Sequence, residues 1–143
     1  MIVKQVSAFL ENKAGRLREL ADVLAENGID ISALSLADTE EYGVLRMIVN
    51  DPEKAVSVLK ASGVFCSVTD TLAVAIDDKP GGFAKALAIF TERGVDVKYM
   101  YACLSRSAEK ALMIVSVDDP AAADRLLVGT EEGRVSPEEI FRI

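Results

Sequence analysis

The chain has 143 residues, of which 50% are hydrophobic and 27% are charged, and its formal net charge at pH 7 is −7. This composition is typical of a globular protein, and such an acidic surface would repel a phosphate backbone or an anionic membrane. Histidine is absent, which excludes histidine-based acid–base catalysis, nucleophile pairs with serine or cysteine, and histidine-containing metal sites. We therefore expect no nucleic-acid or membrane partner, no metal, no cofactor and no catalytic residue.

The two cysteines give no sign of a redox or zinc site, because Cys66 and Cys103 are far apart and form no C-x-x-C motif. Both are expected to be free and to behave as small buried hydrophobes. The sequence shows neither a charged-then-apolar leader nor an apolar run long enough to span a bilayer. The expected location is the cytoplasm.

The first half of the chain begins with a strand pattern and continues with a helix pattern. Residues 2–10 carry spaced apolar side chains and predict a strand, and residues 12–15 form a short polar loop. Apolar residues then recur at i, i+3, i+4 and i+7, which predicts an amphipathic helix with one buried stripe. The residues of that stripe are Leu17, Leu20, Ala21 and Leu24.

A second strand is predicted from Ile29-Asp30-Ile31 onward, and its alternation changes phase near Ala33. If the two isoleucines face the core, Asp30 points to the opposite face of the sheet. Leu34 and Leu36 continue the pattern one residue out of step, which indicates a β-bulge or the end of the strand.

The rest of the first half predicts a hairpin, a helix and a short strand. A polar turn at residues 38–43 leads into a strand at residues 44–49, so the second and third strands form a hairpin. Asp51-Pro52 is typical of a helix start, with the aspartate as N-cap and the proline at the first helical position. Ser62-Gly63 ends this helix, and residues 64–68 predict a fourth strand. The element order is βαββαβ.

The second half repeats the first, and an internal repeat constrains the choice of fold. Three landmarks recur at one constant offset along the chain: Gly15 and Gly81, Gly28 and Gly94, Asp30 and Asp96. Pro52 and Pro120 pair at a slightly larger offset, because the second hairpin turn, at residues 105–109, is longer than the first. Hairpin turns tolerate insertions well, so the longer turn supports the alignment.

The elements of the second half follow the same order as those of the first. Strands are predicted at residues 72–76, 95–101 and 111–117, and helices at residues 83–93 and from Asp119-Pro120 onward. The alternating side chains of the second of these strands are Val95, Val97, Tyr99 and Tyr101. A final strand is expected at residues 138–143. The two domains are therefore residues 1–69 and 70–143, without a flexible linker, and the sequence leaves open whether they exchange terminal strands.

Each half carries the pattern N-x-[AP]-G-x-[LF], with Asp78 in place of the asparagine in the second copy, followed by a helix, a glycine and a V/I-D-V/I strand. This arrangement resembles the ACT domain, and two tandem copies cover nearly the whole chain. The resemblance implies an α+β fold of two ferredoxin-like βαββαβ modules, each an antiparallel sheet with helices on one face. ACT domains usually bind amino acids or related effectors beside the loop after the first strand, at an interface between two modules.

The glycine that opens the first helix of each copy, Gly15 or Gly81, leaves a row of backbone N–H groups at a helix N-terminus. Such groups favour a negatively charged ligand group, here a carboxylate. The alternative interpretation is a turn that needs a compact residue. The Gly81-Gly82 loop is expected to be more open than the Gly15-Arg16 loop.

The resemblance implies further ligand contacts. Asn12 and Asp78 stand where ACT domains often place Asn or Asp against the ligand, although a loop residue that bonds its own backbone is the alternative. Asp30 and Asp96 stand where Asn is common, and a carboxylate there can accept from an ammonium but cannot donate; both could also be exposed strand residues. The candidate ligand-binding residues are Asn12, Ala14, Gly15, Asp30, Asp78, Pro80, Gly81 and Asp96.

The function that these observations favour is that of a regulatory protein which senses an amino acid and has no catalysis of its own. Each half-sized module has a thin core and an open sheet edge, so we expect self-association as a homodimer. The alternative is a regulatory subunit of an amino-acid biosynthetic enzyme, similar to the small subunit of acetolactate synthase. The sequence does not identify the amino acid, the occupied module or the partner.

Two functions of other classes are less favoured. An acylphosphatase-type enzyme needs an arginine and an asparagine at one loop, and the second copy has Asp78 and Gly82 where the first has Asn12 and Arg16. An RNA-binding sheet needs aromatic platforms with basic flanks, and the acidic charge argues against it.

Overall fold

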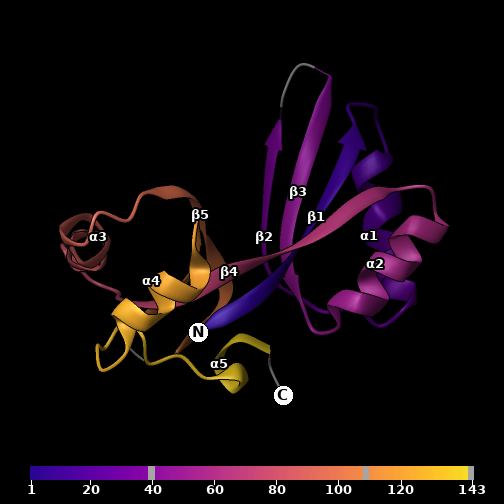
Figure 1. Ribbon diagram of the computed structural model, residues 1–143. Helices are drawn as coiled ribbons and strands as arrows, with labels where there is room; N and C mark the ends of the chain where they lie inside the picture. The colour runs from indigo at the N-terminus through magenta and orange to yellow at the C-terminus, as the bar shows by residue number, and fades with distance from the viewer. Residues whose placement is uncertain (39–40, 108–109, 142–143) are drawn as a thin grey trace. The chain divides into compact units, whose positions relative to one another are not determined.

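The computed structural model describes residues 1–38, 41–107 and 110–141. The expected hairpin turns, at residues 38–43 and 105–109, lie partly outside these ranges. The helices and strands divide between two compact units (Figure 1). Unit one comprises residues 4–69, and unit two combines Met1–Val3 with the chain from Asp70 onward. Both units mix helices with antiparallel strands, so the α+β class expected from the sequence is confirmed.

Unit one has the expected βαββαβ order. Its elements are β1 (Ile2–Glu11), α1 (Arg16–Glu26), β2 (Ile31–Asp38), β3 (Tyr42–Val49), α2 (Pro52–Ala61) and the start of β4 (Phe65–Asp77). The central strand β3 pairs antiparallel with β1 on one side and with β2 on the other. Helices α1 and α2 lie together on one face of these strands (Figure 1).

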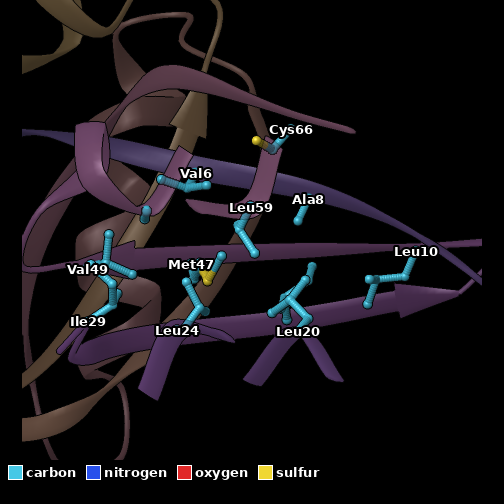
Figure 2. Close-up of a cluster of buried hydrophobic side chains, with 12 residues drawn as sticks. Val6, Ala8, Leu10, Leu20, Leu24, Ile29, Met47, Val49, Leu59 and Cys66 are labelled. Carbon is cyan, nitrogen blue, oxygen red and sulfur yellow. The ribbon is translucent and has the colours of Figure 1, made fainter. Parts of the chain in front are cut away.

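The core of unit one forms where the two helices meet the sheet (Figure 2). Alternate residues of β1 supply Val6, Ala8 and Leu10, because successive strand side chains point to opposite faces. Leu20 and Leu24 of α1 are 3% and 1% exposed, and burial of a leucine stabilises the fold by roughly 1.5–3 kcal/mol.

The buried stripe of α1 differs from the predicted one. Leu17 is 43% exposed and Ala21 is also exposed, whereas Val23 packs against the core beside Leu20 and Leu24. The helix is therefore turned so that its first residues leave the core, which places Leu17 beside the loop that precedes the helix.

The predicted phase change in the second strand is confirmed as an irregularity at Ser32. Ile31 pairs with Val49 but Ala33 pairs with Ile48, so one extra residue stands in β2. The extra residue explains why the apolar positions continue out of step beyond this point.

Unit two contains the same irregularity at Lys98, one repeat offset from Ser32. Val97 pairs with Val117, but Tyr99 pairs with Ser116 and Tyr101 with Ile114. The bulge moves Tyr99 and Tyr101 to the face opposite Val97, so the continuous alternation predicted for Val95, Val97, Tyr99 and Tyr101 is wrong.

Unit two continues along β4 and adds five elements. These are α3 (Gly82–Glu92), β5 (Val97–Ser107), β6 (Lys110–Val117), α4 (Pro120–Leu127) and the short α5 (Pro137–Phe141). Strand β6 pairs antiparallel with both β4 and β5. The buried core residues are Leu72, Val74, Phe90, Val115, Val117, Ala123 and Leu127.

The strand predicted at residues 138–143 is wrong in its described part, because Pro137–Phe141 is helical; residues 142 and 143 lie outside the described residues. The sequence carries a capping signal at this point. The carboxylate of Glu139 accepts hydrogen bonds from the backbone N–H and the hydroxyl of Ser136, which favours a helix that starts at Pro137.

Two short segments lie beside β4 in unit two, where a fourth strand of that unit would stand. Ala73 N donates to the carbonyl of Met1 at 2.8 Å, and Ala75 N donates to the carbonyl of Glu132 at 2.9 Å. The buried hydroxyl of Thr71 also donates to the carbonyl of Val3. Strand β1 thus begins in unit two and continues in unit one, which is one form of the terminal exchange that the sequence left open.

The two Asp-Pro helix starts provide a matched test of capping. Asp51 accepts from Lys54 N at 3.0 Å, and Asp119 accepts from Ala122 N at 3.1 Å. We expect Asp51→Ala and Asp119→Ala each to lower the free energy of unfolding by about 1 kcal/mol, measured by urea denaturation. Asn replacements keep an acceptor and should cost much less. An equal loss for Asn and Ala would show that the cap is not responsible.

Candidate ligand site at the start of the first helix of each unit

Gly15 and Gly81 have the same unusual backbone conformation, with φ of +86° and +87°. Each precedes a helix, α1 or α3, and the left-handed region that each occupies favours glycine. A Cβ atom at either position would meet nothing within 4 Å. The glycines are therefore needed for the turn itself and not for a close approach of another part of the chain.

The first turns of these two helices present backbone donors. The first helical bonds run from Glu19 N to the carbonyl of Gly15 and from Lys85 N to the carbonyl of Gly81. Neither glycine has a side chain with which to cap the helix. Arg16 N and Gly82 N, the first of each helix, donate to the carbonyls of Lys13 and Lys79. The N–H groups that follow them in the first turn have no partner within an α-helix, and they lie at its positive end. This geometry suits a carboxylate or another anion.

A pocket lies beside each glycine loop, at repeat-equivalent positions. The pocket in unit two has a volume of about 480 Å³ and is lined by Ile76, Asp77, Asp78, Lys79, Pro80, Phe83, Ala111 and Met113. Its floor is apolar and its rim is charged. Phe83 is 50% exposed and forms one wall, so it does not belong to a fully buried stripe as Phe90 does.

The matching pocket in unit one is smaller, at about 180 Å³, and is lined by residues that include Asn12, Lys13, Arg16, Leu17 and Leu36. Asn12 Nδ2 donates to Asp38 Oδ2 at 3.3 Å, and Asn12 N donates to the carbonyl of Glu41 at 3.2 Å. The side chain of Asn12 thus ties the loop to the end of β2. Its neighbour Ala14 is exposed.

The unit-two loop is held by an ion-pair cluster that sequence reasoning missed. Lys110 donates to the carboxylate of Asp77 and, at 3.1 Å, to Glu131. Lys85 lies 3.4 Å from Asp77 and 3.7 Å from Glu132. The hydrogen bond from Lys110 is the main cause that lowers the pKa of Asp77, and the same bond raises the pKa of Lys110. Only tertiary contacts bring these charges together.

The expected openness of the Gly81-Gly82 loop is wrong. Gly82 is buried, and a Cβ atom there would collide with the carbonyl oxygen of Asp77. The second glycine therefore permits a close approach between the start of α3 and the end of β4. Asp78 and Pro80 stay exposed on the outside of this tightened loop.

Asp30 and Asp96 lie at the opposite ends of α1 and α3 from the glycine loops. Asp30 N donates to Asn50 Oδ1 at 2.9 Å, and Asn50 N donates to the carbonyl of Asp30 at 3.1 Å. Asp96 borders a separate pocket of about 200 Å³ beyond the end of α3. A helix of 11 residues spans roughly 16 Å. Within one unit, these aspartates therefore cannot share one amino acid with the glycine loop.

The remaining reactive groups do not form a catalytic or metal constellation in the part of the chain that the structure describes. Cys66 and Cys103 are free thiols, and burial raises the pKa of Cys103 to about 11, so it stays protonated at neutral pH. No cluster of three metal-ligating side chains occurs among the described residues. None of the described helices has the length and apolarity needed to cross a bilayer.

The fold and pockets define two small α+β units in tandem, each with a glycine-opened helix beside a cavity of small-molecule size. A family model for an ACT domain pair matches residues 1–142. The chain belongs to this family, which confirms the tandem ACT arrangement expected from the repeat.

Solved structures with the same fold include protein BT0572 from Bacteroides thetaiotaomicron. It is 36% identical over 89% of this chain and 87% of its own length, with a TM-score of 0.82. The ligand-free regulatory subunit of aspartate kinase from Thermus thermophilus is 14% identical, with 89% and 95% of the two chains covered and a TM-score of 0.63.

The regulatory subunit of aspartate kinase from Thermus flavus is 15% identical, with 89% and 93% covered and a TM-score of 0.61. At these identities the two aspartate kinase subunits show a shared fold alone. A comparison with curated proteins found no match.

The Asp77–Lys110 pair predicts an acid limb in the stability profile. A carboxyl pKa lowered by folding adds stability that is present above the unfolded-state pKa and is lost as pH falls through the folded-state pKa. Because the pKa of Asp77 is lowered, we expect stability to fall below about pH 4. Lys110→Met should flatten this limb, measured as urea midpoints between about pH 7 and pH 3. Lys79→Met, an exposed control in the same unit, should leave the limb in place; loss of the limb in both variants, or in neither, would contradict the assignment.

Proposed function

We propose that this ACT pair, with residues 1–69 and 70–143 as its two modules, is a regulatory protein that binds an amino acid and lacks catalytic activity. Its output is a contact with another protein or a change in its own assembly, because regulation requires a second site or partner for the ligand to influence. A cytoplasmic location stays a prediction from the sequence.

The observation that carries the proposal is the repetition of one geometry in both modules. Each has a left-handed glycine, a helix N-terminus without a side-chain cap from that glycine, and an adjoining pocket. The proposed ligand loops are residues 12–15 and 78–81, which contain Asn12, Ala14, Gly15, Asp78, Pro80 and Gly81. Backbone N–H groups in the first helical turn that follows each loop would receive the ligand carboxylate.

Asp30 and Asp96 enter this proposal in a narrower role. Because α1 or α3 separates each from the glycine loop of its own module, they are candidates for the ligand ammonium only where the loop belongs to another copy of the module. Such an arrangement agrees with the interface position expected for ligands of ACT domains.

A regulatory subunit of an amino-acid biosynthetic enzyme is the form of this function that the structural neighbours favour. Two of them are regulatory subunits of aspartate kinase, and another structure contains aspartokinase alpha and beta subunits, with a TM-score of 0.56 and 15% identity. Co-purification with a large catalytic partner would separate this form from a free-standing sensor.

Amino-acid binding should be visible as a gain in thermal stability. A ligand at a hundred times its dissociation constant stabilises the native state by about 2.7 kcal/mol, which corresponds to a melting shift of roughly a few degrees. We expect one amino acid of the twenty, or a small chemically related set, to give this shift. Amidation of the ligand carboxylate should abolish the shift, because the backbone donors lose their charged partner. A flat screen on folded protein would refute amino-acid binding.

Self-association is the second expected property. A ferredoxin-like module of this size buries a thin core, and unit one carries Phe9 and Phe65 with exposures of 40% and 74% and ring centroids 5.5 Å apart. Exposed aromatic pairs favour pairing with another chain. Light scattering at micromolar to millimolar concentration should therefore give a dimer, and a monomer over this whole range would contradict the expectation.

A further inference from the structure

A groove of about 340 Å³ in unit one lies between the end of β1, helix α1 and the turn that follows α2. Leu20, Val23 and Val64 form apolar parts of its wall, and Glu11, Arg16 and Glu19 supply its charges. The groove shares Glu11 and Arg16 with the smaller pocket beside the Gly15 loop, so the two cavities adjoin at the start of α1.

The same walls occur in unit two, at positions given by the internal repeat. The offset that pairs Gly15 with Gly81 also places Lys85 where unit one has Glu19, and Ala75 where unit one has Phe9. Helix α4 is shorter than α2, so the left-handed Gly129 stands where unit one has Gly63, and the chain of unit two then continues through Glu131 and Glu132.

Unit two fills the equivalent place with its own chain. The carbonyl of Glu132 accepts from Ala75 N at 2.9 Å, and the Glu132 carboxylate lies 3.7 Å from Lys85 Nζ. Glu131 lies 3.6 Å from the same ammonium. Glu132 is only 7% exposed, so this acidic turn is packed against α3 and β4. Opposite charges on the helix and the turn hold the two together.

Unit one lacks both the lysine on the helix and the acidic turn that pairs with it in unit two. The helix position carries a glutamate, Glu19, and the turn Ser62-Gly63-Val64 has no charged residue. The groove charges pair along its rim instead: Arg16 Nη1 lies 3.0 Å from Glu19 Oε2, and Lys13 Nζ lies 3.0 Å from Glu11 Oε2. Arg16 and Glu19 have side chains 46% and 66% exposed, so both remain open to an incoming group.

We propose that unit one is the ligand-binding unit of the pair and that its groove takes an α-amino acid with an apolar side chain. This inference rests on the proposed amino-acid-sensing function. The ligand carboxylate lies at the start of α1, where the Arg16 guanidinium on the rim of the groove adds to the backbone donors of the adjoining Gly15 loop. Glu11 and Glu19 receive the ammonium, and the apolar wall at Val23 and Val64 receives the side chain. Acidic amino acids are disfavoured, because two carboxylates, Glu11 and Glu19, border the groove.

The inference can be tested by introducing into unit one an ion pair like the one between Lys85 and Glu132 in unit two. The double variant Glu19→Lys/Val64→Glu places a lysine on α1 and a glutamate on the turn that lines the same groove, which imitates the Lys85–Glu132 ion pair of unit two. Calorimetric titration with L-leucine and L-phenylalanine should give a dissociation constant at least tenfold weaker for the double variant than for the unchanged protein. Glu26→Lys makes a charge reversal at an exposed position in the last turn of the same helix and should leave binding unchanged. L-glutamate should not bind.

Methyl NMR spectra of the unchanged protein provide a second test that does not depend on how the variants fold. Saturating L-leucine or L-phenylalanine should shift the methyl signals of Leu20, Val23 and Val64. Shifts confined to Ile76 and Met113, which line the pocket of unit two, would overturn the inference.

The outcomes separate this inference from the function on which it rests. Amino-acid binding that the double variant retains at full strength would overturn the groove assignment and leave the sensing function intact, as would a protein that binds only polar amino acids. Failure of all twenty amino acids to bind the folded, unchanged protein would refute both.

Discussion

Strand β4 is one continuous strand of 13 residues that serves both units, and this covalent constraint governs the rest of the structure. Residues up to Thr69 belong to unit one, and the following residues belong to unit two, so no linker allows the second unit to complete itself independently. The place beside β4 in unit two is taken by Met1 and by Glu132. The hydrogen bond to Met1 fixes the start of β1, and the hydrogen bond to Glu132 draws the turn after α4 against α3.

The two repeats have similar backbone folds, and they differ in the arrangement of the turn after the second helix of each. Lys85 and Lys110 bind the acidic residues around it in unit two, whereas the equivalent positions in unit one carry Glu19 and Tyr42. Ion pairs at exposed positions contribute about 0–1 kcal/mol each, which is small beside the burial of the core side chains. Their main effect is therefore to position the turn, and the two units differ in local charge and in access to the groove more than in their cores.

Much of the fold could be predicted because the signals are local. The Asp-Pro caps and the phase change near Ala33 follow from residues close in sequence, and each was found where expected. Errors arose where the outcome depends on tertiary contacts. The rotation of α1 exposes Leu17, the bulge at Lys98 displaces Tyr99, and Gly82 packs on the carbonyl of Asp77 instead of opening the loop. The site was predicted as the two glycine loops together with Asp30 and Asp96. The pockets beside the loops were not predicted, because only tertiary contacts bring residues such as Leu36 and Met113 to the loops.

The groove of unit one also has a position suited to communication along the chain. Its wall residue Val64 directly precedes Phe65, the first residue of β4, and β4 runs on as the strand that unit two is built upon. A ligand alters a protein only as far as it binds one conformation better than another. A ligand held between α1 and the Ser62-Gly63-Val64 turn would favour conformations in which that turn is drawn toward the helix, as the acidic turn of unit two already is. The shared strand then provides a continuous covalent element by which a difference at this turn reaches the second unit, and the resulting coupling would act equally in both directions.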